Sequence, residues 1–256
     1  LDVPIVDAHR ALGHRIMLCA PTGRAAKRLS EATRFEARTI HRTLEFNPKT
    51  GQFKRGADDP LDAELVLVDE ASMMDLLLAQ SLLAAVPTGA RLVLVGDVDQ
   101  LPPVGPGQVL RDVISSGAAS VVRLTEVFRQ ASRSAIVLGA HQILGGSVPT
   151  PTPTGTKGDG DLFIVRAKEP EATAALLVQS LRRMSEAYGL DPRRDVQVLT
   201  PMRRGPLGTE RLNELLQREL NPAAPKGGGG QLRPGDKVMQ LRNDYDKEVF
   251  NGDVGE

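Results

Sequence analysis

Two neighbouring carboxylates, Asp69 and Glu70, follow directly on the apolar run LVLV at residues 65–68. A short aliphatic run of this kind is typical of a buried strand, which places both acids at its carboxyl end. The first acid could hold Mg²⁺, largely through water, and the second could orient and deprotonate an attacking water. Because adjacent negative charges repel, a cation is expected beside them. The pair indicates nucleotide hydrolysis, although the letters VDE alone end many strands.

Three further segments carry groups suited to phosphate. The Pro-rich loop GDVDQLPPVGPG at 96–107 presents Gln100, whose amide could hold a γ-phosphate or the attacking water. Arg129, in LTEVFRQ, could stabilise transition-state charge, an effect of roughly 10³ to 10⁵ in rate where it operates. Taken alone, it is typical of a surface arginine. Pro21, Thr22 and Gly23 stand where a helix is expected to begin, and free backbone N–H groups there attract phosphate.

These groups require a parallel sheet to bring them together. Continuous apolar strands alternate with longer helical patterns, which is typical of a doubly wound α/β domain with helices on both faces of its sheet. Ligands bind such sheets at the carboxyl ends of the strands. The domain is expected to span residues 1–148, with strands at 15–20, 64–69, 91–97 and 120–124 and helices at 23–33, 75–86, 107–117 and 133–146.

The remainder of the chain reads as a second unit of similar kind. A Pro-, Thr- and Gly-rich linker is expected at 149–161, followed by a partial α/β domain over 162–256. Its strands are predicted at 161–167 and 195–201, and its helices at 169–188 and 208–220. From about residue 231 short strands with Gly and Asn-Gly turns predict a small β module.

Composition narrows the function classes. The formal net charge is zero, which argues against general nucleic-acid coating. Nine Lys/Arg and three Asp/Glu occupy residues 24–55, whereas residues 56–75 hold seven acids and no base. A polyanion track beside a metal site would need this division, although a solvated helix face followed by an acidic loop also fits. Without an apolar run of membrane-spanning length or a secretion signal, we expect a cytoplasmic protein. The single cysteine, Cys19, reads as a small buried hydrophobe.

The motifs, in their order along the chain, resemble those of RecD-like superfamily 1 DNA helicases. The segments are CAPTGRAAKRL, TIHRTL, LVLVDEASMMD, LVGDVDQLPPVGPG, LTEVFRQ, VLTPMRRGPLGTERLN and GDKVMQLRNDYDKEVFNGDVGE. The resemblance implies two RecA-like motor domains, a small strand-separating β-hairpin, or pin, at 45–56, and the start of an SH3-like insertion. It also implies an ATP- and Mg²⁺-dependent motor that moves 5′ to 3′ on single-stranded DNA and opens duplexes at single-strand/double-strand junctions during recombination and repair.

Site residues carry over motif by motif. Asp69 would be the Mg²⁺ ligand, Glu70 the catalytic base, Gln100 the γ-phosphate sensor and Arg129 an arginine finger. The pin would present Asn47, Pro48 and Lys49. DNA contacts would come from Pro21, Thr22, Gly23, Arg24, Thr39, His41 and Arg42 in the first motor domain, and from Thr200, Pro201, Met202, Arg203, Asn243 and Asn251 in the second.

The chain departs from this family in one respect. The Gly-rich loop ending in Gly-Lys-Ser/Thr, which holds the nucleotide phosphates, is not in the sequence; it is expected at or just before Leu1. We therefore expect the central portion of a helicase, inactive as an ATPase by itself, which works alone or in a nuclease complex. Two alternatives remain: a chain with the helicase fold that binds DNA or a partner without ATPase activity, and the helicase part of a conjugative relaxase.

Overall fold

The computed structural model describes residues 2–124, 134–153, 160–222, 232–244, 247 and 249–256. They form two compact units. The first comprises Leu1–Leu124 and Gln240–Asp253, and the second Thr125–Met239 and Val254–Glu256. The chain thus first passes between units earlier than the expected linker at 149–161. The domain limits at 148 and 162 stay predictions, because compact units need not coincide with folding domains.

A four-stranded parallel sheet forms the centre of the first unit; its parallel character was predicted, and so were three of its strands, whereas the edge strand at Ala37–Thr39 was not. Its strands are β1 (Ile16–Ala20), β2 (Ala37–Thr39), β5 (Leu65–Val68) and β6 (Arg91–Leu94), in the order β2-β1-β5-β6. All four residues of β5 are fully buried. This burial explains the unbroken LVLV run, because a central strand covered on both faces has no polar side.

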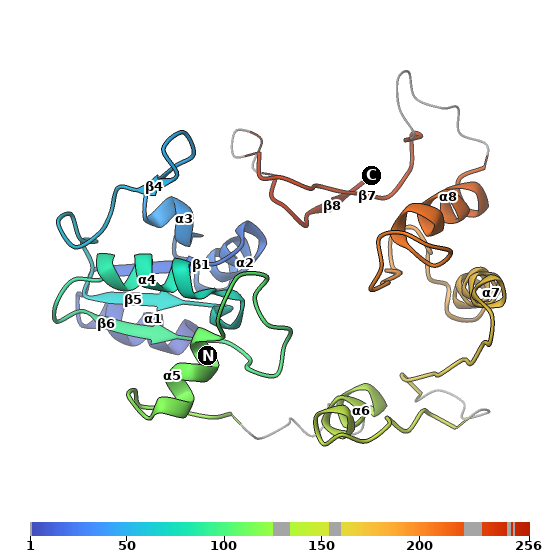
Figure 1. Cartoon of the computed structure of the whole chain (residues 1–256), viewed down its shortest axis with the longest axis horizontal. Helices are drawn as coiled ribbons and strands as arrows, with labels where there is room; N and C mark the ends of the chain where they lie inside the picture. Colours follow the sequence, from blue (N-terminus) through green and yellow to red (C-terminus); the bar gives the residue numbers. More distant parts are fainter. Residues whose placement is uncertain (1, 125–133, 154–159, 223–231, 245–246, 248) are drawn as a thin grey trace. The chain divides into compact units, whose positions relative to one another are not determined.

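Helices cover both faces of the sheet. Alternate strand residues point to opposite faces. Val66 and Val68 therefore join a core cluster with α4 (Leu76–Ala85) and α5 (Val109–Ser116), whereas Leu67 joins another with α1 (Asp2–Ala11) and α2 (Gly23–Thr33). Figure 1 shows α4 and α1 on either side of β5. The α/β prediction for this part of the chain is confirmed.

The predicted hairpin is present. After β2 the chain forms the short helix α3 (Ile40–Thr43), and then β3 (Phe46–Asn47) pairs antiparallel with β4 (Gln52–Phe53). Gly51 has φ +69°, a left-handed conformation that glycine adopts without strain and that lets the chain turn back. The hairpin rises from α3 away from the sheet (Figure 1).

The second unit contains the helices α6 (Ala135–Leu144), α7 (Pro170–Tyr188) and α8 (Thr209–Leu220), close to their predicted positions. Its strands β7 (Val238–Met239) and β8 (Val254–Gly255) form a hairpin within the predicted β module. Between them the chain forms an Asp244–Val249 bridge and turns at Gly252, with φ +93°.

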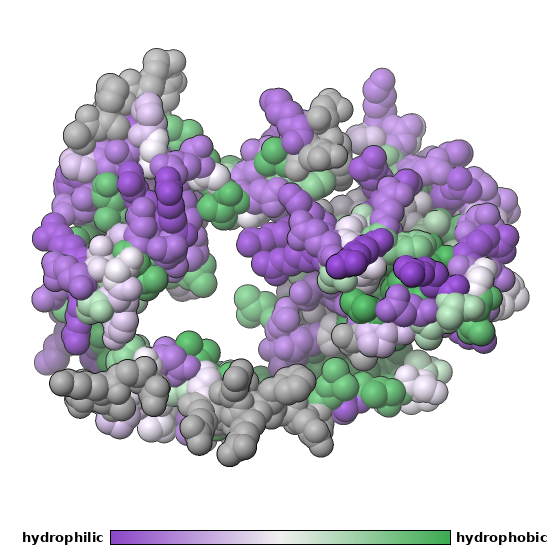
Figure 2. Space-filling model, turned by 180° about the vertical axis from the view of Figure 1, so that it is seen from behind, coloured by the Kyte–Doolittle hydropathy of each residue, from purple (hydrophilic) through white to green (hydrophobic). Residues whose placement is uncertain are grey.

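Three predicted strands are not strands in the structure: 120–124 in the first unit, and 161–167 and 195–201 in the second. A strand needs a ladder partner, and none of these segments has one among the residues that are described. Their apolar side chains consequently remain exposed, among them Val122, Phe163 and Leu199. Figure 2 shows hydrophobic groups of this kind between hydrophilic ones over the visible surface.

Cys19 is completely buried in β1, and burial raises the pKa of its thiol to about 12. The interpretation as a small hydrophobe is confirmed. In the described part of the chain, no helix combines the length and apolar character needed to span a membrane.

Candidate functional site

The predicted groups of the first unit meet at one edge of the sheet. Because β2, β1, β5 and β6 are parallel, their carboxyl ends lie together. Asp69 follows β5, Asp97 and Gln100 follow β6, Pro21 and Thr22 follow β1, and Thr39 ends β2. The strand order therefore places the acids and Gln100 at two neighbouring strand ends and the groups expected to contact DNA at the other two.

The backbone after β5 fixes both carboxylates. The Asp69 N–H donates to the Cys19 carbonyl (3.0 Å), which extends the β1–β5 ladder by one residue, and one Asp69 carboxylate oxygen accepts the Glu70 N–H (2.8 Å). Glu70 has φ +53° and ψ +36°, a left-handed conformation that is uncommon for a residue with a side chain. The Ala71 N–H then donates to the Val95 carbonyl (2.8 Å), so that β6 holds the turn.

Glu70 has an elevated pKa. Its partial burial is the main cause, and the negative charges of Asp69, Asp97 and Asp2 add to the effect; Arg28, on α2, opposes it. Burial and like charge both disfavour the ionised form of a carboxyl. A carboxyl that takes up protons more readily than usual is suited to accept one from water.

The loop after β6 is held at both ends. The Asp97 side chain accepts the Asp99 N–H (2.9 Å), and the Gln100 N–H donates to the Asp97 carbonyl (3.3 Å). Further along, the Leu76 N–H at the start of α4 donates to the Pro106 carbonyl (2.8 Å). A Cβ placed on Gly105 would lie 2.7 Å from Cγ of Asp75, whose carboxylate caps α4 by accepting the Leu78 N–H (2.8 Å). Gly105 therefore permits a close approach between this loop and α4.

The helix starts after β1 and β2 are capped by the threonines that the sequence singled out. Thr22 is the N-cap of α2 and accepts the Ala25 N–H (3.2 Å), and Thr39 is the N-cap of α3 and accepts the Arg42 N–H (3.2 Å). The Arg24, His41 and Arg42 residues are exposed, whereas Gly23 is buried. The hydroxyls therefore have structural partners already, and the exposed groups nearby are cationic or aromatic.

The segment Gln240–Asp253 packs on the start of α2 within the first unit. The Arg24 guanidinium donates to the Gly252 carbonyl (3.3 Å), and a Cβ on Gly23 would lie 2.6 Å from Cγ of Phe250. The Asn251 N–H donates to the Asn243 side chain (2.8 Å), so the two predicted asparagines contact each other.

The other predicted residues lie elsewhere. Four of them, Thr200, Pro201, Met202 and Arg203, belong to the second unit. There the Thr200 hydroxyl donates a hydrogen bond to the Leu207 carbonyl (2.7 Å), and the Arg203 guanidinium forms an ion pair with Glu210 in α8 (3.1 Å). Arg129 lies outside the described residues. No group of three or more His, Cys, Asp or Glu side chains in the described part of the chain forms a metal cage.

Comparison with known proteins agrees with the motifs. Residues 3–106 match an AAA domain, and residues 212–256 match the SH3 domain of ATP-dependent RecD-like DNA helicases. The ATP-dependent RecD2 DNA helicase of Deinococcus radiodurans is 43% identical over 98% of the chain. The chain is a homologue of the RecD-like helicases. The RecBCD enzyme subunit RecD of Mycolicibacterium smegmatis is 31% identical over 94% of the chain, and the helicase dda of Enterobacteria phage T4 is 36% identical over 38%.

The chain spans 33% of the length of the Deinococcus helicase and 48% of the Mycolicibacterium subunit. The two family matches fall on the two parts of the RecD-like chain where the structure places the parallel sheet and the β7–β8 hairpin. The resemblance read from the motifs is thereby confirmed, as is an α/β fold with a RecD-like SH3 segment.

Motif reading missed three contributors to the site. Arg28 and Asp2 act on the charge of Glu70 from α2 and α1, and Asp75 meets the Gly105 loop from α4. Arg28 could have been found from the sequence, because it lies four residues after Arg24 on the predicted helix and residues at that spacing share a helix face. Nothing local signals Asp2, since only the folding of α1 against the sheet brings it near Asp69.

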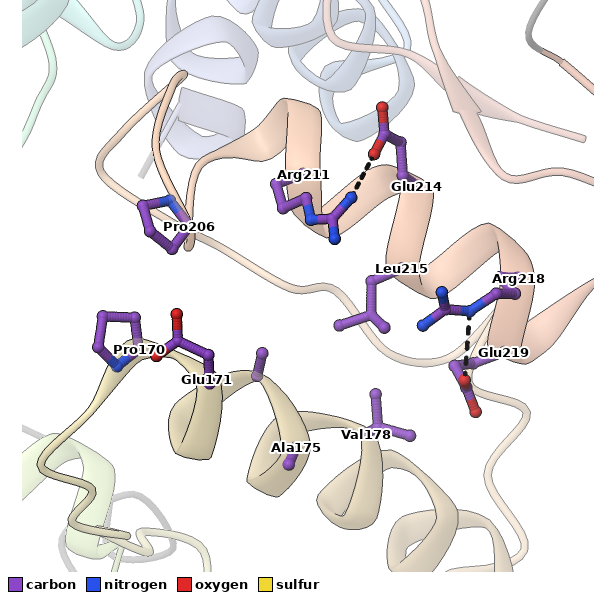
Figure 3. A pocket seen from close by; sticks show the side chains of 11 residues that line it. Pro170, Glu171, Ala175, Val178, Pro206, Arg211, Glu214, Leu215, Arg218 and Glu219 are labelled. Carbon is purple, nitrogen blue, oxygen red and sulfur yellow. Dashed lines mark hydrogen bonds and ion pairs between the residues drawn. The ribbon is translucent and has the colours of Figure 1, made fainter.

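A cavity in the second unit lies away from these residues. A space of about 540 Å³ separates α7 from α8, with Ala175, Val178 and Leu215 facing it (Figure 3). Ion pairs line its rim: Arg211 with Glu214 at 2.9 Å and Arg218 with Glu219 at 3.7 Å. None of the predicted site residues lines it, so its size alone does not mark it as a nucleotide site.

Proposed function

We propose that this chain is the central portion of an ATP-dependent DNA helicase that moves 5′ to 3′ on single-stranded DNA and opens duplexes at junctions. One observation carries the proposal: Asp69, Glu70 and Gln100 share the carboxyl edge of a parallel sheet in a chain homologous to RecD-like helicases. Three parts of the proposal follow from the family resemblance alone. They are the direction of movement, a role in recombination and repair, and activity either as a single protein or within a nuclease complex.

Each residue at the edge has a proposed task in hydrolysis. Glu70 accepts a proton from the attacking water, and its elevated pKa supports this task. Gln100 orients the γ-phosphate or that water from a loop whose backbone is tied to Asp97. Arg129 neutralises charge that develops on the phosphates. ATP itself would be held by a Gly-Lys-Ser/Thr loop preceding α1 in a longer protein.

The residues present fit a hydrated Mg²⁺ better than a metal caged by protein. Mg²⁺ retains several waters and takes only one or two carboxylates. Asp69 would supply one, with its free oxygen, because the other accepts the Glu70 N–H. Asp2 has a buried side-chain oxygen without a partner among the described residues, and a water of the ion would satisfy it. The cation would neutralise phosphate charge and relieve repulsion within this acidic group.

DNA would meet the exposed groups after β1 and β2, namely Arg24, His41 and Arg42, together with Pro21, Thr22, Gly23 and Thr39. Thr200, Pro201, Met202 and Arg203 would meet it from the second motor domain, and Asn243 and Asn251 would also contact it. Asn47, Pro48 and Lys49 at the tip of the hairpin would part the strands. Arg24 and Arg42 supply positive charge, which dominates affinity for a phosphate backbone.

The decisive experiment uses the longer helicase. DNA-stimulated ATP hydrolysis and unwinding of forked duplexes with a 5′ single-stranded tail, but not a 3′ tail, are expected. Single-stranded DNA binding without ATP hydrolysis would instead favour the binding chain of helicase fold. A nuclease domain encoded upstream would favour the relaxase alternative.

A further inference from the structure

The β3–β4 hairpin is joined to α3 by a triangle of rings. The His41 centroid lies 5.4 Å from that of Phe46, edge-on at 89°, and 5.5 Å from that of Phe53. Phe46 and Phe53 are directly opposite each other in the β3–β4 register, with centroids 5.0 Å apart. All three separations fall in the range of favourable aromatic pairs. The triangle therefore links both strands of the hairpin to one residue of α3.

The other contacts at the base of the hairpin cannot set its direction as firmly. The N–H groups of Lys54 and Arg55 both donate to the Leu44 carbonyl, at 3.2 and 3.1 Å. Glu45 pairs with Lys54 at 2.8 Å and with Arg55 at 2.7 Å. Exposed ion pairs of this kind contribute little, and a two-stranded hairpin by itself is barely stable. The hairpin has only two paired residues per strand, and its rings add packing against α3 and the core to these backbone bonds.

His41 also belongs to the segment proposed to contact DNA. It stands in the four-residue helix α3, beside Arg42 and two residues after the cap Thr39. Its imidazole has a lowered pKa, mainly through burial, which the negative charge of Asp75 partly opposes. A ring that packs on two phenylalanines offers them an aromatic surface.

We propose that His41 is a positioning residue whose ring fixes the direction of the hairpin relative to α3, so that strand separation depends on ring packing at this position and not on its polar nitrogens. The inference rests on the proposed function of the hairpin as a strand-separating pin. It predicts that a movement of α3 on DNA is transmitted directly to the hairpin.

Four variants of the longer helicase test this inference through fork unwinding and DNA-stimulated ATP hydrolysis. His41→Phe keeps a ring and should restore most of the unwinding that His41→Ala loses. His41→Ala and Phe53→Ala each remove one ring, and with it two of the three ring contacts, and should lose about ten- to hundred-fold in unwinding, as expected for a misplaced functional group. Phe53→Ala should retain DNA-stimulated ATP hydrolysis. Asp62→Ala, which breaks the exposed Arg15–Asp62 ion pair (3.2 Å) away from the hairpin, is the matched control and should unwind normally.

The outcomes separate the inference from the proposed function. Loss of unwinding in His41→Phe as complete as in His41→Ala would show that the nitrogens act, and normal unwinding by Phe53→Ala would show that the rings do not orient the hairpin. Either result overturns the inference. A wild-type helicase without unwinding activity would instead refute the function.

Amide exchange in the 256-residue chain reads the ring contact independently of any activity. The N–H groups of Lys54 and Arg55, which bond to Leu44, should stay protected in His41→Phe and exchange faster in His41→Ala. Equal protection in His41→Ala and the wild type would overturn the inference, whether or not the longer protein unwinds DNA.

Discussion

Replacing Gly105 by alanine should loosen the loop that carries Gln100 from helix α4. The new Cβ would lie 2.7 Å from Cγ and 2.8 Å from Cβ of Asp75, well inside the 3.4–4 Å of an ordinary contact. Asp75 cannot turn away freely, because its carboxylate caps α4 through the Leu78 N–H. Gly105 does not have a positive φ, so the substitution tests space rather than backbone conformation.

The magnitude follows from the two ways in which the structure can relax. If Asp75 rotates, α4 loses its N-cap, which costs about 1 kcal/mol. If the loop moves instead, it loses the hydrogen bond from Leu76 to Pro106, and overpacking of this kind costs about 1–3 kcal/mol. We therefore expect the free energy of unfolding to fall by about 1–3 kcal/mol.

Urea unfolding followed by circular dichroism measures this change, since the chain contains no tryptophan for fluorescence. Gly56→Ala is the matched control, because a Cβ there meets nothing within 4 Å, and it should change stability by less than about 0.5 kcal/mol. Asp75→Gly removes the obstructing side chain, and glycine is still a tolerated N-cap. Gly105→Ala should therefore lower the free energy of unfolding less in the Asp75→Gly background than in the wild type, by at least about 0.5 kcal/mol. Equal costs in both backgrounds would refute the steric argument.

Three further predictions concern the proposed activity. Glu70→Gln in the longer helicase should retain ATP binding and lose about 10²- to 10⁴-fold in turnover; near-normal turnover would rule out Glu70 as the base. Glu70 must be ionised to act as the base, and its pKa is raised. The rate of ATP hydrolysis by the wild type should therefore begin to fall, as pH decreases, at a pH above the ordinary glutamate range. A pH–rate profile measures this. The affinity of the 256-residue chain for single-stranded DNA should fall with salt, with a log–log slope reduced by about 0.7 for each of Arg24→Ala and Arg42→Ala. Arg91→Ala, at the opposite end of β6, should leave that slope unchanged, and a salt-independent affinity would exclude a basic track.

Much of the first unit could be predicted because the apolar runs and helix caps that indicate its strands and helices lie close together in the sequence and agree with one another. The LVLV run of β5 could be read as a buried strand since both of its faces are covered, and Thr22 and Asp75 stand where helix N-caps are expected. Asp69 and Gln100 were then brought together by the general rule for strand ends in parallel sheets. The contributions of Arg28 and Asp2 to the charge at Glu70 could not be read this way, because they depend on how α1 and α2 pack.

The second unit shows the opposite limit. The segments 161–167 and 195–201 have apolar composition suited to strands, but composition does not supply a ladder partner, and neither segment joins a β-ladder among the described residues. The helices of the same unit form at their predicted positions because their hydrogen bonds lie within each segment. Strand prediction is therefore conditional on long-range pairing in a way that helix prediction is not.

Strand order also separates the opposite charges of a chain whose formal net charge is zero. The basic segment at 24–55 contains α2, β2 and α3, whereas the acidic residues of 56–75 lead into and follow β5. With the order β2-β1-β5-β6, the ends of β2 and β1 form a basic half of the edge, and the ends of β5 and β6 form an acidic half. The halves meet between β1 and β5, where Arg28 opposes the raised pKa of Glu70. On the proposed function, a polyanion would lie along the basic half and a divalent cation would bind at the acidic half, because topology separates charges that the sequence merely places in succession.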